Sequence, residues 1–230
     1  LKTNAGYLDA TFQFLDIPNS MYQGSLTTEK RSDRQYEVEF RNVSFRYPGR
    51  VDWALKNVSM KFKVGRRLAI VGENGSGKTT FIKLAAGLLT PTAGEITICG
   101  NKIGTATKAV VSYLPDRPYF SRQVRVEQQL DFFQDFYADF DRTRAEEMLS
   151  ALNISLSAKF KALSKGNQEK VQLVLVMSRR AKLYLLDEPI GGVDPAARDY
   201  ILNTIITNYD PSATVLISTH LIADVERVLD

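Results

Sequence analysis

The sequence is poor in the residues that build disulfide frameworks and metal centres, because its 230 residues include one cysteine, Cys99, and one histidine, His220. A single cysteine excludes an internal disulfide and favours a reducing compartment, where Cys99 would be a small residue of the core. No run approaches the roughly 18 consecutive apolar residues of a membrane span. Any membrane-crossing part would therefore have to come from outside this sequence.

The excess of positive over negative charge is also small, since the net charge is +4. The basic residues are scattered rather than clustered, which argues against nucleic acid as a partner. Hydrophobic residues make up 44% and charged residues 24% of the chain, as in a folded globular protein. The length suits one α/β domain with a small insertion.

A glycine-rich stretch from Gly72 to Thr79, GENGSGKT, matches the phosphate-binding loop pattern GxxxxGK[ST]. It follows an apolar strand pattern at 68–71 and opens a helical pattern at 79–88. Its glycines let backbone N–H groups surround phosphate oxygens, Lys78 can reach the terminal phosphates, and the Thr79 hydroxyl can bind Mg²⁺. The residues expected to contact the nucleotide here are Gly72, Glu73, Asn74, Gly75, Ser76, Gly77, Lys78, Thr79 and Thr80.

Two acidic residues, Asp187 and Glu188, end an apolar strand pattern at 183–186. Such a strand can deliver Asp187 to the Mg²⁺ of a bound triphosphate and leave Glu188 as the general base toward the attacking water. His220 follows the strand pattern at 214–218, where a neutral imidazole could hydrogen-bond the γ-phosphate. We therefore expect Lys78, Glu188 and His220 to be catalytic.

Together these motifs resemble those of the nucleotide-binding domain of ABC (ATP-binding cassette) ATPases, over about residues 36–230. Tyr47 resembles the aromatic residue that stacks on adenine. The stretch 163–167, LSKGN, resembles the family signature LSGGQ, and Asp194 in GVDP resembles the D-loop aspartate. The resemblance implies ATP and Mg²⁺ as cofactors. It also implies a head-to-tail dimer with a second nucleotide-binding domain, in which Ser164 and Gly166 face the other subunit's γ-phosphate.

The resemblance further implies ATP hydrolysis that powers a transmembrane permease domain from the cytoplasmic face of the cell membrane. Two departures from the family pattern matter. The signature has Lys165 within its glycine pair and Asn167 in place of its terminal glutamine, and Asp116 stands where the family has a glutamine that contacts Mg²⁺. A carboxylate can bind Mg²⁺, so we expect Asp116 to join Thr79 and Asp187 at the metal. Gln123 is the less favoured substitute for that glutamine.

The expected fold class is α/β, a P-loop NTPase core with a mostly parallel sheet, an antiparallel β subdomain and an all-helical insertion. Strand patterns at 36–45, 54–64, 95–99 and 109–114 and helical patterns at 167–180 and 195–208 lead to this expectation. We divide the chain into a linker or arm from a membrane domain (1–34), the antiparallel β subdomain and first part of the ATP-binding core (35–121), the helical subdomain (122–163) and the second part of the core (164–230).

The helical insertion contains no glycine and has apolar residues at helical spacing. We expect these residues to be core rather than a ligand site: Leu130, Phe133, Phe136, Tyr137, Phe140, Met148, Leu149 and Leu152. An acidic set in the same stretch is expected to be a solvated face rather than a metal site. It comprises Asp131, Asp135, Asp139 and Asp141.

Two unequal parts of the sequence resemble different branches of the family. Residues 1–84 resemble an exporter half-transporter, whereas the chain from about residue 85 resembles a stand-alone cassette subunit of a bacterial efflux system. The chain begins at Leu1 and stops at Asp230 inside a helical pattern at 221–229, so we expect a fragment or an engineered protein. A chimera of two cassettes is the favoured interpretation, and an unusual natural subtype is the alternative.

The favoured function is the ATP-hydrolysing motor of an exporter. The alternative is a chimeric cassette that folds and binds ATP with little coupled turnover. A cassette acting in DNA repair or translation is less favoured, because the sequence lacks the long coiled coils or second cassette usual in those relatives.

Overall fold

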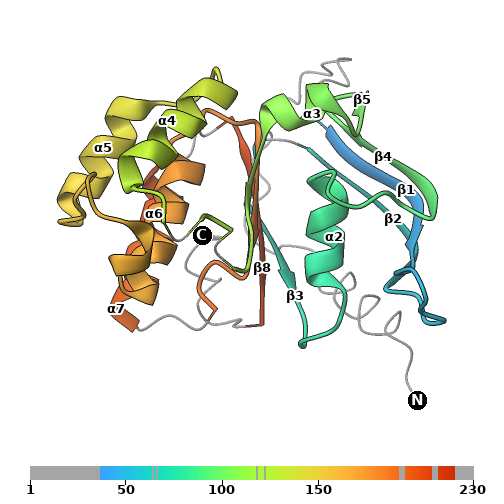
Figure 1. The fold of residues 1–230 in the computed structure, drawn as a ribbon. Coiled ribbons are helices and arrows are strands. Elements are labelled where there is room, and N and C mark those ends of the chain that lie inside the picture. Colours follow the sequence, from blue (N-terminus) through green and yellow to red (C-terminus); the bar gives the residue numbers. More distant parts are fainter. Residues whose placement is uncertain are drawn as a thin grey trace, which may run out of the picture.

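The computed structural model describes residues 37–63, 65, 67–117, 119–121, 123–191, 195–208 and 212–220. The arm 1–34 and Asp194 lie outside these residues. Among them the chain forms an antiparallel and a parallel sheet with helices packed beside them (Figure 1). This is the α/β fold that the sequence predicts.

The antiparallel sheet has the order β2-β1-β4-β5, with β1 Glu37–Phe45, β2 Leu55–Lys63, β4 Ala93–Ile98 and β5 Asn101–Lys102. Its residues alternate between the two faces, as expected for a sheet with one buried face. In β1, Val38 and Phe40 are buried, while Glu39 and Arg41 between and after them are not, and they form an ion pair. The ring of Phe40 stacks on the ring of Phe81 in α2 (Lys78–Ala85), so this sheet packs against that helix.

The parallel sheet has the order β3-β8-β7-β6, with β3 Arg67–Val71, β8 Thr214–Thr219, β7 Leu183–Asp187 and β6 Val111–Leu114. Every residue of β7 and β8 is buried, as in parallel strands covered on both faces. Helix α2 (Lys78–Ala85) covers one face, between the two sheets, and α6 (Lys165–Met177) and α7 (Pro195–Asn208) cover the other (Figure 1). Leu185 accordingly packs in the core toward α2, and Leu186 packs in the core toward α6 and α7.

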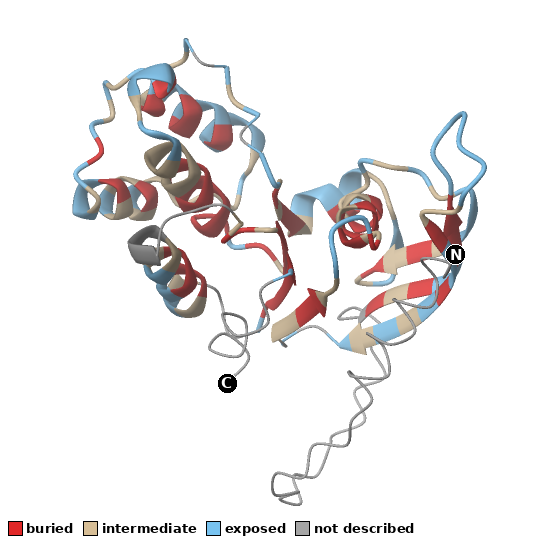
Figure 2. Cartoon of the chain, turned by 90° about the horizontal axis from the view of Figure 1, so that it is seen from below, coloured by how far each residue is buried: buried red, intermediate tan, exposed pale blue. Residues whose placement is uncertain are grey.

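The helical insertion contains α4 (Val126–Phe136), α5 (Arg142–Ala151) and the 3₁₀ turn η2 (Phe160–Ala162), which share an apolar core with α6. The red inner sides and blue outer sides of these helices are visible in Figure 2. Leu130, Phe133 and Leu149 are core residues as predicted. The prediction for Phe136 is wrong, because its side chain at the end of α4 is 69% exposed.

The acidic set of the insertion is not a uniform solvated face. Asp139 pairs through both carboxylate oxygens with the buried Arg179, at 3.0 and 3.1 Å. Asp141 caps α5 by accepting a hydrogen bond from the Arg144 backbone N–H. Asp131 is the exposed type that we expected, since it pairs with Arg142 at the surface. Sequence periodicity could not identify the buried pair, because Arg179 lies 40 residues after Asp139.

The strand expected at 109–114 is in part a helix. Ala109 and Val110 end α3 (Thr105–Val110), and β6 begins at Val111. The Thr107 hydroxyl accepts a hydrogen bond from the Gly104 N–H and so caps the start of α3.

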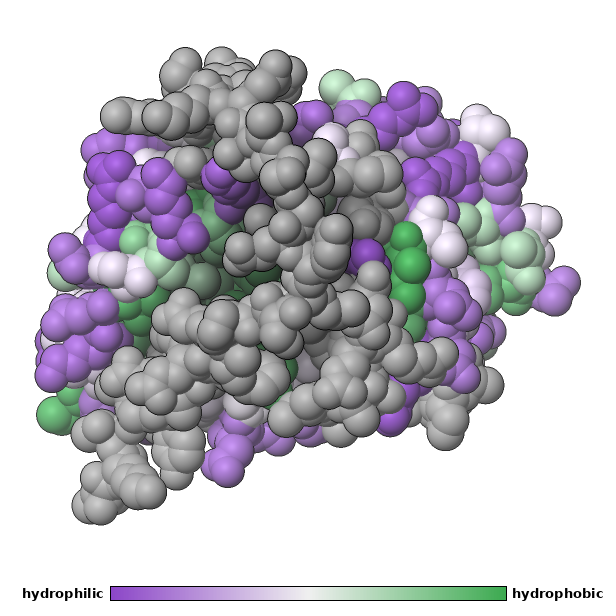
Figure 3. Space-filling view, turned by 180° about the vertical axis from the view of Figure 1, so that it is seen from behind, coloured by the Kyte–Doolittle hydropathy of each residue, from purple (hydrophilic) through white to green (hydrophobic). Residues whose placement is uncertain are grey.

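The helices α2 and α6 also end earlier than expected, at Ala85 and Met177. Cys99 is the partly buried turn residue that follows β4, and its φ is 50°. Seen from behind, the described surface is mostly hydrophilic with smaller hydrophobic areas (Figure 3). No helix within the described ranges is both long and apolar enough to span a bilayer.

Candidate functional site

The candidate site lies where the parallel strands end. Because β3, β6, β7 and β8 run in the same direction, the residues that follow them meet at one edge of the sheet. Open α/β sheets bind their ligands at this edge. The residues placed there are Gly72 after β3, Pro115 and Asp116 after β6, Glu188 after β7, and His220 after β8.

The loop between β3 and α2 depends on two glycines. Gly77 immediately precedes α2 with φ 98°, and a Cβ there would lie 2.8 Å from the Ala54 carbonyl oxygen. A Cβ on Gly72 would lie 2.8 Å from the Ser76 hydroxyl. These positions therefore favour glycine on steric grounds. The free N–H groups of the first turn of α2 face the loop, which makes it suited to an anion.

Lys78 is the first residue of α2, and its side chain, 5% exposed, reaches back to this loop. Its ammonium donates hydrogen bonds to the carbonyl oxygens of Gly72 and Glu73, at 2.7 and 3.1 Å. The Nζ atom also lies 3.5 Å from the Glu188 Oε1. The cation is thus held between the loop and the acidic residue that follows β7.

Asp187 is fully buried at the end of β7. Its Oδ1 accepts hydrogen bonds from the Thr79 and Ser218 hydroxyls, at 3.0 and 2.7 Å. Its Oδ2 is buried without a hydrogen-bond partner among the described residues. Burial raises the pKa of this carboxyl, and the two hydroxyls oppose the effect only in part.

This oxygen set fits a divalent cation. Mg²⁺ prefers carboxylate and hydroxyl oxygens and usually binds one or two carboxylates. The partnerless oxygen of Asp187 and the Thr79 hydroxyl beside it would supply such ligands, and a cation would remove the cost of the buried charge. Thr79 and Asp187 are two of the three metal ligands that the sequence predicts, and the third, Asp116, lines the cleft described below.

Glu188 has a backbone conformation that few non-glycine residues adopt, with φ 49°. Residues held in this way cost about 1–3 kcal/mol each and cluster at functional sites. Ser218 holds the conformation, because both its carbonyl oxygen and its hydroxyl accept from the Glu188 N–H. The Glu188 Oε2 lies 2.9 Å from the His220 Nδ1.

Ser218 therefore orients both acidic residues, and sequence reasoning missed it. The signal was a hydroxyl within the apolar strand pattern that precedes His220. The three residues expected to be catalytic, Lys78, Glu188 and His220, lie in one chain of contacts.

A cleft of about 380 Å³ opens beside the loop. Tyr47 is 39% exposed at its wall, and its hydroxyl lies 3.1 Å from the Thr80 hydroxyl. Asp116 reaches the same cleft from the end of β6. The remaining lining residues are Ala54, Asn74, Gly75, Gly77, Lys78, Thr79 and Glu188.

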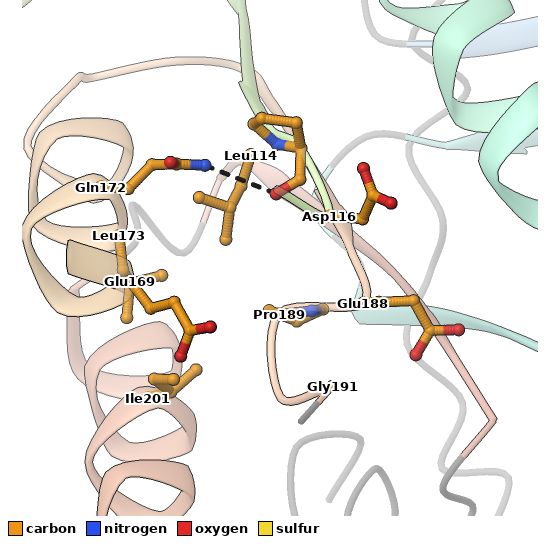
Figure 4. A pocket seen from close by; sticks show the side chains of 10 residues that line it. Leu114, Asp116, Glu169, Gln172, Leu173, Glu188, Pro189, Gly191 and Ile201 are labelled. Carbon is orange, nitrogen blue, oxygen red and sulfur yellow. Dashed lines mark hydrogen bonds between the residues drawn. The ribbon is translucent and has the colours of Figure 1, made fainter. Parts of the chain in front are cut away.

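The Asp116 loop also faces α6. Gln172 of α6 donates to the Pro115 carbonyl oxygen at 3.4 Å, and Figure 4 shows Glu169 and Gln172 on one side of a small cavity with Asp116 and Glu188 on the other. The cavity holds about 20 Å³, room for one water. Gln123, the less favoured substitute for Asp116, lies before α4 and lines neither of these two cavities.

The signature stretch begins α6 away from this cleft. The Ser164 hydroxyl caps the helix by accepting from the Asn167 N–H at 3.2 Å, and Gly166 lies in the first turn. Neither residue lines the cleft that contains Lys78. Lys165 is exposed and lies 3.8 Å from Glu169. Asp194 is outside the described residues, so its predicted place at the nucleotide is not addressed by the structure.

Comparison with known proteins gives a consistent result. A family model described as ABC transporter matches residues 55–191. The ABC transporter ATP-binding protein YtrB of Bacillus subtilis (strain 168) is 30% identical over 194 residues, which are 83% of this chain and 66% of that protein. The chain thus spans about two thirds of the length of this relative.

Solved structures agree with this match. An ATP-binding subunit of an ABC transporter has a TM-score of 0.73 at 30% identity, covering 84% of this chain and 83% of that one. A dimeric ATP-binding cassette bound to ADP and Pi has a TM-score of 0.72 at 22% identity, covering 83% and 90%. The second likeness concerns the fold alone.

Proposed function

The chain belongs to the ABC transporter family, and on this premise we propose that it is the ATP-binding and ATP-hydrolysing motor domain of an exporter. The observation that carries the proposal is the chain of contacts at the strand ends. It runs from Lys78 in the phosphate loop to Glu188 and on to His220, with Thr79 and Asp187 beside it. These are the side chains that phosphoryl transfer to water requires: a cation, a base and oxygen ligands for Mg²⁺.

The roles follow from the geometry. Lys78 and the N–H groups at the start of α2 would bind the phosphates, and Tyr47 would stack on the adenine. Mg²⁺ held by Thr79 and Asp187, with Asp116 at the cleft, would neutralise charge on the phosphate oxygens. Glu188 would accept a proton from the attacking water, and His220 would hold Glu188 in place and hydrogen-bond the γ-phosphate.

We infer that the working form is a dimer with a second nucleotide-binding domain, formed when ATP binds. Ser164 and Gly166 begin α6, whose first N–H groups form an anion site, yet they do not line the cleft beside Lys78. An anion at the start of α6 would therefore come from a second copy. The dimeric state of the neighbouring cassette of the same fold supports this arrangement. Asp194 would lie at the same interface.

A transmembrane permease domain is the second proposed partner, which would place the chain at the cytoplasmic face of the cell membrane. A groove of about 580 Å³ lies between the α2–α3 side and α4, with the exposed apolar side chains Leu88, Tyr119 and Phe132 at its wall. Monomeric soluble proteins seldom expose contiguous apolar surface without a partner. Asp116 reaches both this groove and the nucleotide cleft, so docking and hydrolysis could be linked there.

The chimera is a finer proposal, supported by the different resemblances of residues 1–84 and the rest of the chain. Both parents would share the cassette core, and cores tolerate size-matched apolar substitutions. The predicted result is a protein that binds ATP but couples poorly to either parent's permease. Efficient ATP-driven transport with one parental permease would contradict the poor coupling, and a single natural gene for all 230 residues would contradict the fusion.

Replacing Glu188 by Gln tests the proposed function. Phosphate release should fall about 10²–10⁴-fold, as for loss of a general base, while Mg·ATP binding is retained. Sedimentation with ATP should detect a stable dimer of Glu188→Gln and monomers of the nucleotide-free protein. Full turnover in Glu188→Gln would overturn the assignment. An inactive wild-type protein that binds ATP would favour the alternative, a cassette without turnover.

A further inference from the structure

Tyr113 and Asp187 lie on the same face of the parallel sheet. In the register of β6 and β7, Tyr113 is opposite Leu185, and Asp187 is two residues further along β7. Residues two apart on a strand point to the same side, and neighbouring strands are about 4.8 Å apart. That side is covered by α2, from which Thr79 reaches Asp187, and Tyr113 packs at the edge of the core on this side.

Each of these residues has a buried polar atom without a hydrogen-bond partner among the described residues: the Tyr113 hydroxyl and the Asp187 Oδ2. The tyrosine hydroxyl can donate and accept a hydrogen bond, and the carboxylate oxygen accepts. Buried polar groups in native proteins are nearly always paired, with protein, ordered water or an ion. Two such atoms left over on the same face of adjacent strands indicate that a bound species completes them.

The charges around Tyr113 indicate which species. Asp187 and Asp116 lie near Tyr113. Tyr113, Asp116 and Lys83 of α2 also line the groove of about 580 Å³ described above. A phenol hydroxyl is a poor direct ligand for a cation, but its oxygen can accept a hydrogen bond from water.

We propose that Tyr113 is a positioning residue for the divalent cation: its hydroxyl oxygen accepts a hydrogen bond from a water bound to the ion that Thr79 and Asp187 would hold. Mg²⁺ keeps several waters in protein sites, and groups that orient such ligands affect metal affinity. The inference rests on the proposed function, because it presupposes that Mg²⁺ binds at Asp187. Because Tyr113 also lines the groove of about 580 Å³ proposed above for the permease domain, this hydrogen bond would connect that groove to the metal site.

The test replaces Tyr113 by Phe, which removes the hydroxyl oxygen and keeps the ring. Binding of Mn²⁺ in the presence of ATP is measured by electron paramagnetic resonance in a Glu188→Gln background, so that no turnover is needed. We expect the Mn²⁺ affinity to fall about 10–100-fold, as for other groups that orient metal ligands. The melting temperature of the nucleotide-free protein should stay the same or rise, because Phe removes a buried hydroxyl that has no partner.

Tyr184→Phe is the matched control. Its hydroxyl is also buried but donates to the Arg179 carbonyl oxygen on the other side of the sheet. That variant should melt at a lower temperature and bind Mn²⁺ like the parent. Unchanged Mn²⁺ affinity in Tyr113→Phe would overturn the inference, and so would a loss of affinity accompanied by a lower melting temperature. If the Glu188→Gln parent itself does not bind Mn²⁺ with ATP, the proposed function fails as well.

Discussion

His220 and Glu188 are joined side chain to side chain, with 2.9 Å between the His220 Nδ1 and the Glu188 Oε2. They come from the ends of adjacent strands, β8 and β7, and are 32 residues apart in the sequence. The other carboxylate oxygen of Glu188 faces Lys78 at 3.5 Å. The Glu188 carboxylate is thus held from two sides, and the strained backbone of Glu188 is stabilised by Ser218.

Replacing His220 by Ala should therefore lower turnover without lowering ATP affinity. Removing one preorganised transition-state donor typically costs about 10²–10³-fold in kcat, and we expect a loss of this size. Steady-state phosphate release gives kcat, and equilibrium binding of Mg·ATP gives the affinity. His220→Gln, which keeps a hydrogen-bonding side chain, should recover part of the rate. Equal rates for His220→Ala and wild type would remove His220 from the reaction.

The ring of Tyr47, not its hydroxyl, should determine ATP affinity. Stacking of an aromatic side chain on a base is worth about 1–3 kcal/mol, so Tyr47→Ala should weaken ATP binding roughly tenfold or more. Tyr47→Phe loses only the contact with the Thr80 hydroxyl and should bind ATP almost like wild type. Isothermal titration of both variants distinguishes the two contributions. A larger loss in Tyr47→Phe than in Tyr47→Ala would contradict the stacking role.

Arg179 should be a major determinant of stability, although it lies outside the catalytic residues. It is 2% exposed, pairs with both oxygens of Asp139 and donates to the carbonyl oxygens of Ala109 and Val111. Its guanidinium also lies 3.8 Å from the centre of the Tyr137 ring. Removing one partner of a buried ion pair costs about 3–5 kcal/mol, so Arg179→Met should unfold at markedly lower denaturant.

The neighbouring Arg180 supplies the control for that variant. Its side chain is 74% exposed and pairs with Asp141 at the surface. Exposed pairs are typically worth about 0–1 kcal/mol, so Arg180→Met should unfold almost like wild type. If both variants lose similar stability in urea, the buried pair is not the cause.

The strands and helices around the nucleotide were predictable because their patterns are local. The phosphate loop, the apolar run before Asp187 and the strand before His220 each carry their own signal, and the structure places them at one sheet edge. The strand pattern at 109–114 did not predict that α3 extends to Val110. The helix start, where the Thr107 hydroxyl accepts from the Gly104 N–H, carries no signal in the composition.

Contacts between distant segments account for the rest of the misses. Ser218 reads as part of an apolar strand until Asp187 and Glu188 are placed next to it. Arg179 reads as one of two adjacent surface arginines until Asp139 of the helical insertion lies against it. Phe136 fits the helical spacing of the core but is the exposed last residue of α4, with its ring beside that of Phe132, which is exposed as well. The spacing of apolar residues identifies one face of a helix, but it does not show which residues of that face are buried by neighbouring elements.

Asp187 should destabilise the protein in the absence of nucleotide and Mg²⁺. Burial raises the pKa of its carboxyl above the ordinary value of about 3.9, so the folded state favours the neutral form. The cost of the charge is then absent at pH values below the unfolded pKa and grows as the pH rises through the folded pKa. The ionised carboxylate would be costly, because its Oδ2 has no partner among the described residues.

Asp187→Asn should consequently melt at a higher temperature than wild type at pH 7 without ligands, because the amide is neutral and its oxygen can still accept from Thr79 and Ser218. The difference between the two proteins should shrink as the pH is lowered and the wild-type carboxyl also becomes neutral. Mg·ADP should raise the melting temperature of wild type far more than that of Asp187→Asn, since only the carboxylate binds the cation well. Asp116→Asn, at an exposed carboxylate, is the control and should melt like wild type without ligands. A nucleotide-free Asp187→Asn protein that melts below wild type at pH 7 would contradict this account of the buried charge.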